Sequence, residues 1–126
     1  MKTQSLKSAC IKTLSKSELY DQKELNGVKV LKNMLGTLDK NFQTNFFYGG
    51  DDTPHKVSMK WYEARMSHET RSEFRLYYES NQVMNSAQLG DNIVVGFDKT
   101  NTLTCILYKI NGEDHQGHIE DWVKIK

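Results

Sequence analysis

Alternation of apolar and polar side chains predicts several short β-strands. Within residues 56–62 the apolar side chains Val57, Met59 and Trp61 recur at every second position, which is the period of a half-buried strand. Phe74–Tyr78 alternates in the same way, with its first, third and fifth residues on one face. Gln43–Tyr48 is rich in aromatic residues and is followed by two glycines, which indicates a strand that ends in a turn.

The two most apolar segments predict the central hairpin of the core. They are Asn92–Phe97 and Leu103–Ile110, and they flank a polar turn. Ala9–Leu14 is a further expected strand, and His118–Ile125 is a last strand or a short helix.

Two short helices are expected beside these strands. Val28, Leu31 and Leu35 have helical spacing, and Gly36 offers a stop. Ser80 and Asn81 would cap a second helix running through Ala87, which Gly90 would end. Six or seven short strands with one or two helices predict a mainly β fold, either a barrel or a sandwich.

Length and composition predict a single domain over residues 1–126. The chain has no apolar run of the ~20 residues needed to cross a bilayer, and its first residues lack the apolar stretch of a signal peptide. We therefore expect a cytoplasmic protein. Cys10 and Cys105 have no partner motif, so two free packed thiols are expected, with one disulfide as the alternative.

The distribution of basic residues says more than the net charge of +1. Residues 1–40 carry eight lysines against four acids, which would attract a phosphate backbone if they gather on one side. The chain has only three arginines, Arg65, Arg71 and Arg75, and all lie within residues 65–75. A guanidinium can donate two hydrogen bonds at once to a guanine edge, which an ammonium does much less well.

On an extended chain, Arg71, Glu73 and Arg75 share one face. Glu73 could hold the two arginines in place or accept a hydrogen bond from cytosine. This row suits the reading of a G·C pair. The alternative is a solvent-facing strand whose arginines form ordinary cross-strand ion pairs.

The sequence shows no serine nucleophile elbow, phosphate-binding glycine loop or nucleotide-binding fingerprint, and we expect no catalytic residues and no metal site. The histidines His115 and His118 lack helical ligand spacing, so a polar loop is expected there. Asp91, Asp98 and Lys99 form the one candidate set for a small Mg²⁺-dependent nuclease.

Another alternative is a β-barrel that binds single-stranded nucleic acid. It would stack bases on aromatic side chains. The candidates are Phe46, Phe47, Tyr48, Tyr62, Tyr77 and Tyr78.

The segment Trp61–Leu76 resembles the N-terminal effector-binding domain of EcoRII-type (type IIE) restriction endonucleases. The shared pattern comprises Trp61-Tyr62, Arg65, Thr70-Arg71, Glu73 and Arg75-Leu76. Similarity is looser in Leu89–Asp98, which looks like that domain's glycine-led apolar strand, and in Ile11–Ser15 and Asn26–Leu31. The resemblance covers roughly residues 9–112.

The resemblance implies a DNA-binding pseudobarrel with seven open-barrel strands and short helices, which places two arms in the major groove of duplex DNA. The second arm would read bases with Arg71, Glu73 and Arg75. The first arm would fall in Tyr20–Lys32, where Lys23 and Asn26 are the expected base readers, although it lacks the glycine-rich run with a histidine that the family has. Backbone contacts or support would come from Arg65, Thr70, Ser72, His68, Lys29 and Lys32.

In that family the domain does not cut DNA, and cleavage resides in a separate nuclease domain that uses Mg²⁺. The resemblance therefore implies a monomeric specificity or effector domain of a bacterial or phage restriction enzyme, with the nuclease domain absent from this chain. Its partner would be double-stranded DNA carrying a short site rich in G·C pairs. No cofactor would be needed for DNA binding itself.

Overall fold

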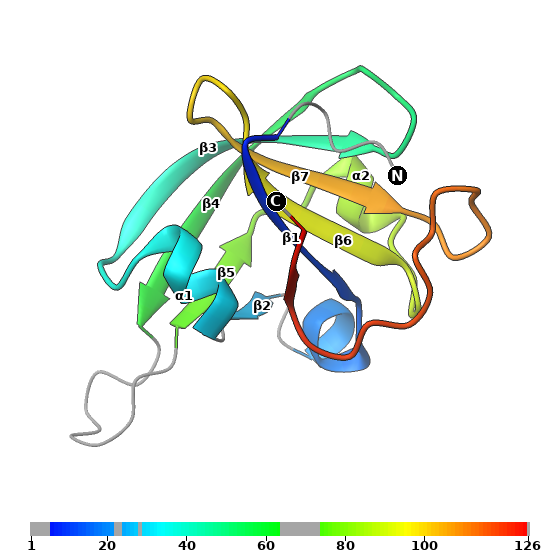
Figure 1. The fold of residues 1–126 in the computed structure, drawn as a ribbon, viewed down its shortest axis with the longest axis horizontal. Helices are drawn as coiled ribbons and strands as arrows, with labels where there is room; N and C mark the ends of the chain where they lie inside the picture. Colours follow the sequence, from blue (N-terminus) through cyan, green and yellow to red (C-terminus); the bar gives the residue numbers. More distant parts are fainter. Residues whose placement is uncertain (1–5, 22–23, 28, 64–73, 126) are drawn as a thin grey trace.

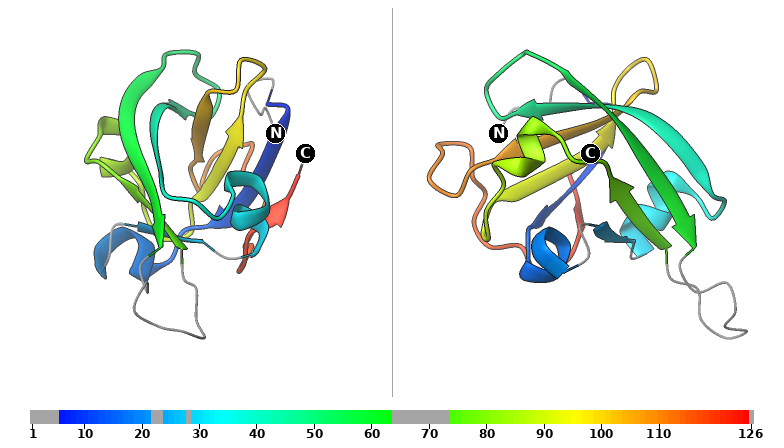
Figure 2. Two further views of the ribbon diagram at one scale, coloured as in Figure 1. Left: turned by 90° about the vertical axis from the view of Figure 1, so that its left-hand side faces the viewer. Right: turned by 180° about the vertical axis from the view of Figure 1, so that it is seen from behind.

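The described part of the chain is built around one eight-stranded sheet that curls into an open half-barrel (Figures 1 and 2). The computed structural model describes residues 6–21, 24–27, 29–63 and 74–125. The spatial order of the strands is β2-β5-β4-β3-β7-β6-β1-β8, so β2 and β8 are the two edges. All neighbours pair antiparallel except β3 and β7, which are parallel.

Most elements are short. The strands are β1 Ser8–Thr13, β2 Glu24–Gly27, β3 Lys40–Tyr48, β4 His55–Glu63, β5 Phe74–Tyr78, β6 Asn92–Phe97, β7 Leu103–Tyr108 and β8 Val123–Lys124. The helical elements are the π-helix η1 Ser17–Asp21 and the α-helices α1 Lys29–Leu35 and α2 Gln82–Asn85. No helix among these described elements is long and apolar enough to span a membrane.

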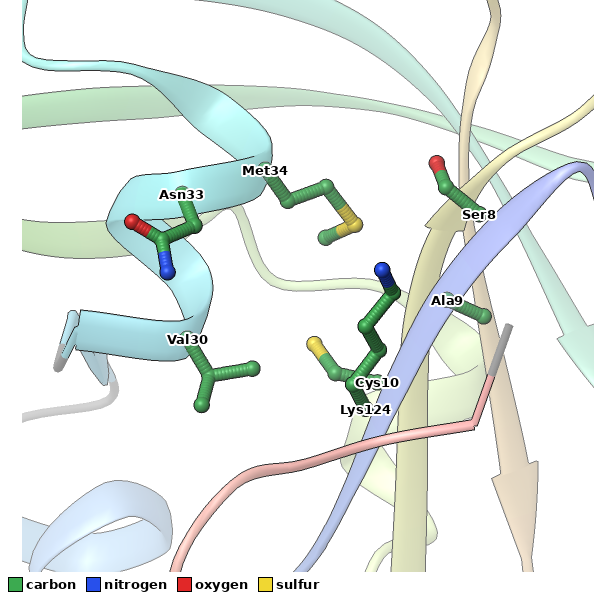
Figure 3. A pocket seen from close by; sticks show the side chains of 7 residues that line it. All are labelled: Ser8, Ala9, Cys10, Val30, Asn33, Met34 and Lys124. Carbon is green, nitrogen blue, oxygen red and sulfur yellow. The ribbon is translucent and has the colours of Figure 1, made fainter.

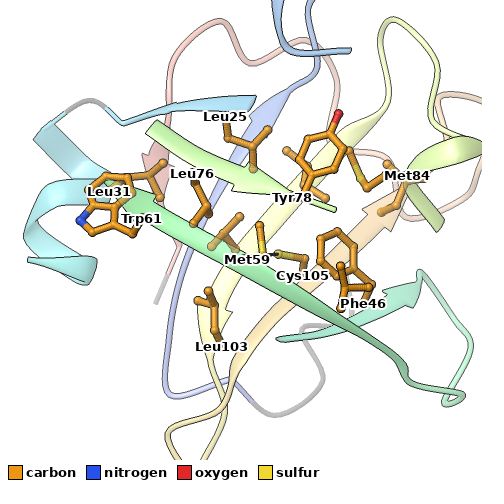
Figure 4. Close-up of a cluster of buried hydrophobic side chains, with 14 of the residues drawn as sticks. Leu25, Leu31, Phe46, Met59, Trp61, Leu76, Tyr78, Met84, Leu103 and Cys105 are labelled. Atoms are coloured by element: carbon orange, nitrogen blue, oxygen red, sulfur yellow. Dashed lines mark hydrogen bonds between the residues drawn. The ribbon is translucent and has the colours of Figure 1, made fainter. Parts of the chain in front are cut away.

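The main core lies inside the curl of the sheet (Figure 4). Trp61, Met59 and Leu76 point into it from β4 and β5, because alternate residues of a strand face the same side. Leu31 and Leu35 of α1 cover one part of this core and are at most 1% exposed. A smaller cluster lies on the other face of the sheet: Leu6, Ala9, Ile11, Val94, Ile106 and Tyr108.

Helix α1 ends because Gly36 adopts a left-handed conformation, with φ of 92°. The amide of Gly36 donates to the carbonyl of Lys32 over 2.8 Å. Its own carbonyl accepts a 3.0 Å hydrogen bond from the indole Nε1 of Trp61. The end of the helix is thereby linked to β4 through the buried side chain of Trp61.

Most of the elements expected from periodicity are confirmed. The mainly β open barrel is correct, although it has eight strands rather than seven. The apolar segments form the expected β6–β7 hairpin, and Phe74–Tyr78 forms β5 with Phe74, Leu76 and Tyr78 buried. Both cysteines are free and buried, as expected.

Several boundaries differ from expectation; strand β3, for example, begins at Lys40 rather than at Gln43. Helix α2 ends at Asn85, because the Ser86 amide already turns back to the Val83 and Met84 carbonyls, so Gly90 does not end it. Strand β7 stops at Tyr108, since the amide of Ile110 donates to the carboxylate of Asp91 instead of continuing the ladder. In the tail, only Val123–Lys124 is strand.

The segment Tyr20–Lys32, expected as one DNA-binding arm, contains regular structure. It includes the end of η1, the edge strand β2 and the first turn of α1. Strand β2 pairs with β5, which places this segment directly beside the strand that carries Arg75.

Candidate nucleic-acid interface

The outer face of β2, β5 and β4 brings together residues that are far apart in sequence. Asn26 is the direct partner of Arg75 across β2 and β5, and Arg75 is the direct partner of Tyr62 across β5 and β4. In the neighbouring row, Glu24, Tyr77 and Lys60 are paired in the same way. Direct partners in antiparallel strands have Cβ atoms about 4.5–5.5 Å apart. We call this surface of β2, β5 and β4 the outer sheet face.

Glu24 links the three strands of this face. One carboxylate oxygen, Oε1, accepts from the Arg75 guanidinium over 3.3 Å, and the other, Oε2, accepts from the Tyr62 hydroxyl. The ion pair is partly shielded from water, since the Arg75 side chain is 21% exposed and that of Glu24 11%. These contacts hold the guanidinium in one orientation on the sheet.

The environment of Tyr62 keeps its hydroxyl protonated. Burial raises the pKa of Tyr62 to about 12, and the hydrogen bond and negative charge of Glu24 act in the same direction. Tyr62 therefore remains a hydrogen-bond donor to Glu24 at neutral pH. Its ring also lies beneath the ammonium of Lys60, which is 5.5 Å from the ring centroid.

Of the residues predicted to contact DNA, four lie where their backbone is described: Asn26, Lys29, Lys32 and Arg75. Lys29 is exposed at the first position of α1. Lys32 lies on the same helix with its ammonium 5.5 Å from the centroid of the Phe74 ring, at the start of β5. Seven further candidates lie outside the described residues: Lys23, Arg65, His68, Thr70, Arg71, Ser72 and Glu73.

The sequence did not single out Glu24, Lys60 or Tyr77 as partners of Arg75. Their relation to it depends on the register of β2, β5 and β4, which periodicity alone does not fix. The sequence contains one indication of this surface. Because Tyr62 directly follows Trp61 in a strand, its side chain is expected on the face opposite to the apolar Trp61.

A groove of about 400 Å³ continues from this face onto β3. Its side chains include Asn41 and Gln43 of β3, Ser58 and Lys60 of β4, and Tyr77 of β5. The Tyr77 side chain is 42% exposed, and the Gln43 amide donates to the Ser58 hydroxyl over 3.2 Å. Phe42, Met59 and the carboxylate of Glu79 also line the groove, so apolar and acidic groups lie beside the amide, hydroxyl and ammonium groups.

The residues considered for a nuclease do not form one site. Asp91 precedes β6 and Asp98 follows it, so about 20 Å of extended strand separates them. Asp91 is fully buried and accepts from the Ile110 amide, the Gln88 amide and the Lys109 ammonium. Asp98 accepts from the backbone of its own turn at Thr100 and Thr102. Both carboxylates stabilise turns.

The aromatic residues considered for base stacking are also dispersed. Phe46 and Tyr78 are buried in the core, at 1% and 6% exposed. Tyr77 lies on the opposite side of β5 from Tyr78. These six side chains therefore do not make one continuous stacking platform.

The polar loop expected around His115 is confirmed. Its imidazole Nε2 is 2.6 Å from the Gly90 carbonyl, and its Nδ1 accepts from the Gly117 amide. Within the described ranges, no group of three or more His, Cys, Asp or Glu side chains is arranged to hold a metal ion.

Comparison with protein-family models, with curated proteins and with solved structures finds no match to this chain. The resemblance to the EcoRII-type effector domain therefore stays a prediction from the sequence.

Proposed function

We propose that the chain binds double-stranded DNA in a sequence-specific manner. The base readers would be Arg75 on the outer sheet face and Asn26, its partner in the register of β2 and β5, together with Arg71, Glu73 and Lys23. The observation that carries this proposal is the direct pairing of Asn26 with Arg75 across β2 and β5. Asparagine and arginine are both suited to base edges. The sequence predicted them on two separate arms, and their backbones belong to neighbouring strands.

The spacing of these strands suits the major groove. The groove is about 12 Å wide and admits a two-stranded β-ribbon. Directly paired residues on such a ribbon lie about 5 Å apart, which lets them address neighbouring bases. Arginine is suited to guanine and asparagine to adenine, since each can make two hydrogen bonds to the base edge.

The cross-strand ion pair with Glu24 is the kind of contact that the alternative to base reading predicts for the arginines, and it also orders Arg75 for a reading role. A free arginine side chain loses rotamer freedom when it is fixed on a base. Glu24 and the neighbouring strands already restrict the Arg75 guanidinium, so less entropy is lost on binding. A purely electrostatic contact to phosphate would not need this ordering.

Phosphate contacts would come from residues around the base readers, as the sequence resemblance implies. Lys29 and Lys32 lie on α1 directly after β2, and Lys60 lies on β4 beside Tyr62. The other backbone or supporting contacts belong to residues 64–73: Arg65, His68, Thr70 and Ser72. We further propose that the chain serves as the specificity or effector module of a restriction enzyme, whose separate nuclease part uses Mg²⁺.

The test begins with selection of bound sites from a library of random duplexes, followed by affinity measurements on the enriched site and on scrambled DNA. We expect an enriched G·C-containing site, and an affinity that falls steeply as salt rises. Arg75→Lys keeps the positive charge but removes the planar guanidinium that can donate two hydrogen bonds to one base. It should weaken the enriched site about tenfold or more, while binding to scrambled DNA stays nearly unchanged.

Lys99→Ala is the matched control. Lys99 lies in the β6–β7 turn, far from the end of β4 and the start of β5 (Figures 1 and 2). It should leave both affinities as in the unaltered protein. Preference for single strands over duplexes would favour the stacking alternative. Failure to enrich any site, or equal loss on specific and scrambled DNA in Arg75→Lys, would overturn base reading by this residue.

A further inference from the structure

The half-barrel remains open between its edge strands, and a cavity lies at this opening. The cavity has a volume of about 350 Å³ and is bounded by α1, which follows the edge strand β2, and by β1 and β8 at the other edge (Figure 3). A volume of this size falls at the lower end of the range for small-molecule sites. The cavity is separate from the outer sheet face described above.

The floor of the cavity is apolar. It is formed by Cys10 of β1 and by Val30 and Met34 of α1, with Ala9 of β1 at its edge, its side chain turned to the other face of the sheet. Burial raises the pKa of the Cys10 thiol to about 12, so this residue remains uncharged at neutral pH. An apolar chain would gain free energy by displacing water from these side chains.

The rim of the cavity carries hydrogen-bond donors. Lys124, Asn33 and Ser8 contribute an ammonium, an amide and a hydroxyl. In Figure 3 the Lys124 ammonium points toward the space between the side chains of Met34 and Ser8. Among the described residues, none provides a hydrogen bond or an ion pair to the side chain of Lys124 or of Asn33.

The charge of the lining selects the ligand. Lys124 is the one ionised side chain of the seven lining residues, and no carboxylate lines the cavity. Lys124 is exposed, so water solvates its ammonium when the cavity is empty; a carboxylate bound there would pair with it, whereas a neutral ligand would not. A single positive charge over an apolar floor matches a monoanion with a hydrocarbon body.

We propose that the opening of the half-barrel binds a small amphiphilic carboxylate, of the class of medium-chain fatty acids. The carboxylate accepts hydrogen bonds from Lys124 and from the neighbouring amide or hydroxyl. The hydrocarbon chain packs against Cys10, Val30 and Met34. This proposal does not depend on DNA binding, and failure of either one leaves the other intact.

Calorimetric titration with sodium octanoate and with 1-octanol tests the proposal. Lys124→Met removes the charge but retains most of the aliphatic stem, and should weaken octanoate binding about tenfold without changing octanol binding. Lys56→Met is the control, since Lys56 is an exposed lysine of β4 that does not line the cavity. It should leave both affinities unchanged.

A second measurement locates the ligand without a mutation. With ¹³C-labelled methionine methyl groups, octanoate should shift the signal of Met34 and leave those of the buried Met59 and Met84 in place. Absence of octanoate binding at millimolar concentration would overturn the proposal. So would binding that Lys124→Met leaves unchanged, or binding that shifts Met59 or Met84 instead of Met34.

Discussion

Two buried threonines differ sharply in how their hydroxyl groups are satisfied. The Thr13 hydroxyl accepts from the Asn92 amide and the Ile119 backbone, at 3.0 and 2.7 Å, and lies 3.3 Å from the Gly117 carbonyl. The Thr44 hydroxyl, also buried, has no hydrogen-bond partner among the described residues. The Thr13 hydroxyl therefore connects β1 to β6 and to the C-terminal tail. The Thr44 hydroxyl has lost its hydrogen bonds to water on burial and has gained none from the described residues.

Replacing each threonine by valine should therefore have opposite effects. Thr44→Val should raise the free energy of unfolding by about 1 kcal/mol, because it removes an unsatisfied polar atom and keeps the branched shape. Thr13→Val should lower it by about 1–3 kcal/mol, because three partners lose their hydrogen bond. Urea unfolding of both variants measures this. Destabilisation of equal size in the two would contradict the assignment.

Buried tyrosines predict a loss of stability in alkaline solution. Burial raises the pKa values of Tyr62, Tyr78 and Tyr108 to about 12 from an ordinary value of 10.0. Because the folded pKa lies above the unfolded one, their contribution is complete below pH 10 and is lost as the pH rises through 12.

We expect Tyr108→Phe to reduce the steepness of this loss. The variant removes one of the three titrating groups. The Tyr108 hydroxyl has no hydrogen-bond partner among the described residues, so its loss should not lower the stability at pH 7. The free energy of unfolding in urea is measured at pH 8 and pH 11 for the variant and for the unaltered protein, and the loss between the two pH values is compared. All other side chains are the same in both proteins, so their contributions cancel. An unchanged difference between the two pH values would refute the expectation.

At the scale of elements, the buried Asp91 joins the start of β6 to the end of β7. Its two oxygens accept from the Gln88 and Ile110 amides at 2.8 and 2.9 Å, and Oδ2 also from the Lys109 ammonium at 2.7 Å. The carboxylate thus ends the β7 ladder and orders the turn before β6. Two elements depend on one side chain.

Asp91→Asn should lower the free energy of unfolding by about 3 kcal/mol. An amide has one acceptor oxygen and would leave either a backbone amide or the ammonium unpaired. The exposed Asp121 gives a control, since Asp121→Asn should stay within about 0.5 kcal/mol of the unaltered protein. Chemical denaturation of the two variants distinguishes them, and similar values would contradict a bridging role for Asp91.

Elements with a clear period could be predicted from the sequence, and those without one could not. β5 and the β6–β7 hairpin follow from alternation and apolar runs. Strand β2 has only four residues, Glu24–Gly27, and depends on pairing with β5. The π-helix η1 depends on the buried Glu18, whose carboxylate accepts from the Lys12 ammonium and from the Ser15 amide. Such tertiary contacts leave no local pattern.

At the scale of the whole molecule, the sequence could identify Arg75 but not the setting that orders it. Its unusual residue type and its place opposite the buried Leu76 were visible in the chain. The partner Glu24 was not, because it lies 51 residues away on an edge strand. The cavity at the opening was equally invisible, since it requires α1 and β8 to face each other across the unclosed sheet.

Because of the strand order, different strands find their partners at different times during synthesis of the chain. Strands β2, β4 and β5, which carry the outer sheet face, and the neighbouring β3 find all their mutual partners within residues 24–78. Strand β1 emerges first but pairs only with β6 and β8, where Cys10 meets Val95 and Lys124. At about 5–20 residues per second, its apolar residues wait roughly 4–17 seconds for β6. The first strand of this sheet to be synthesised is therefore among the last to be incorporated into it.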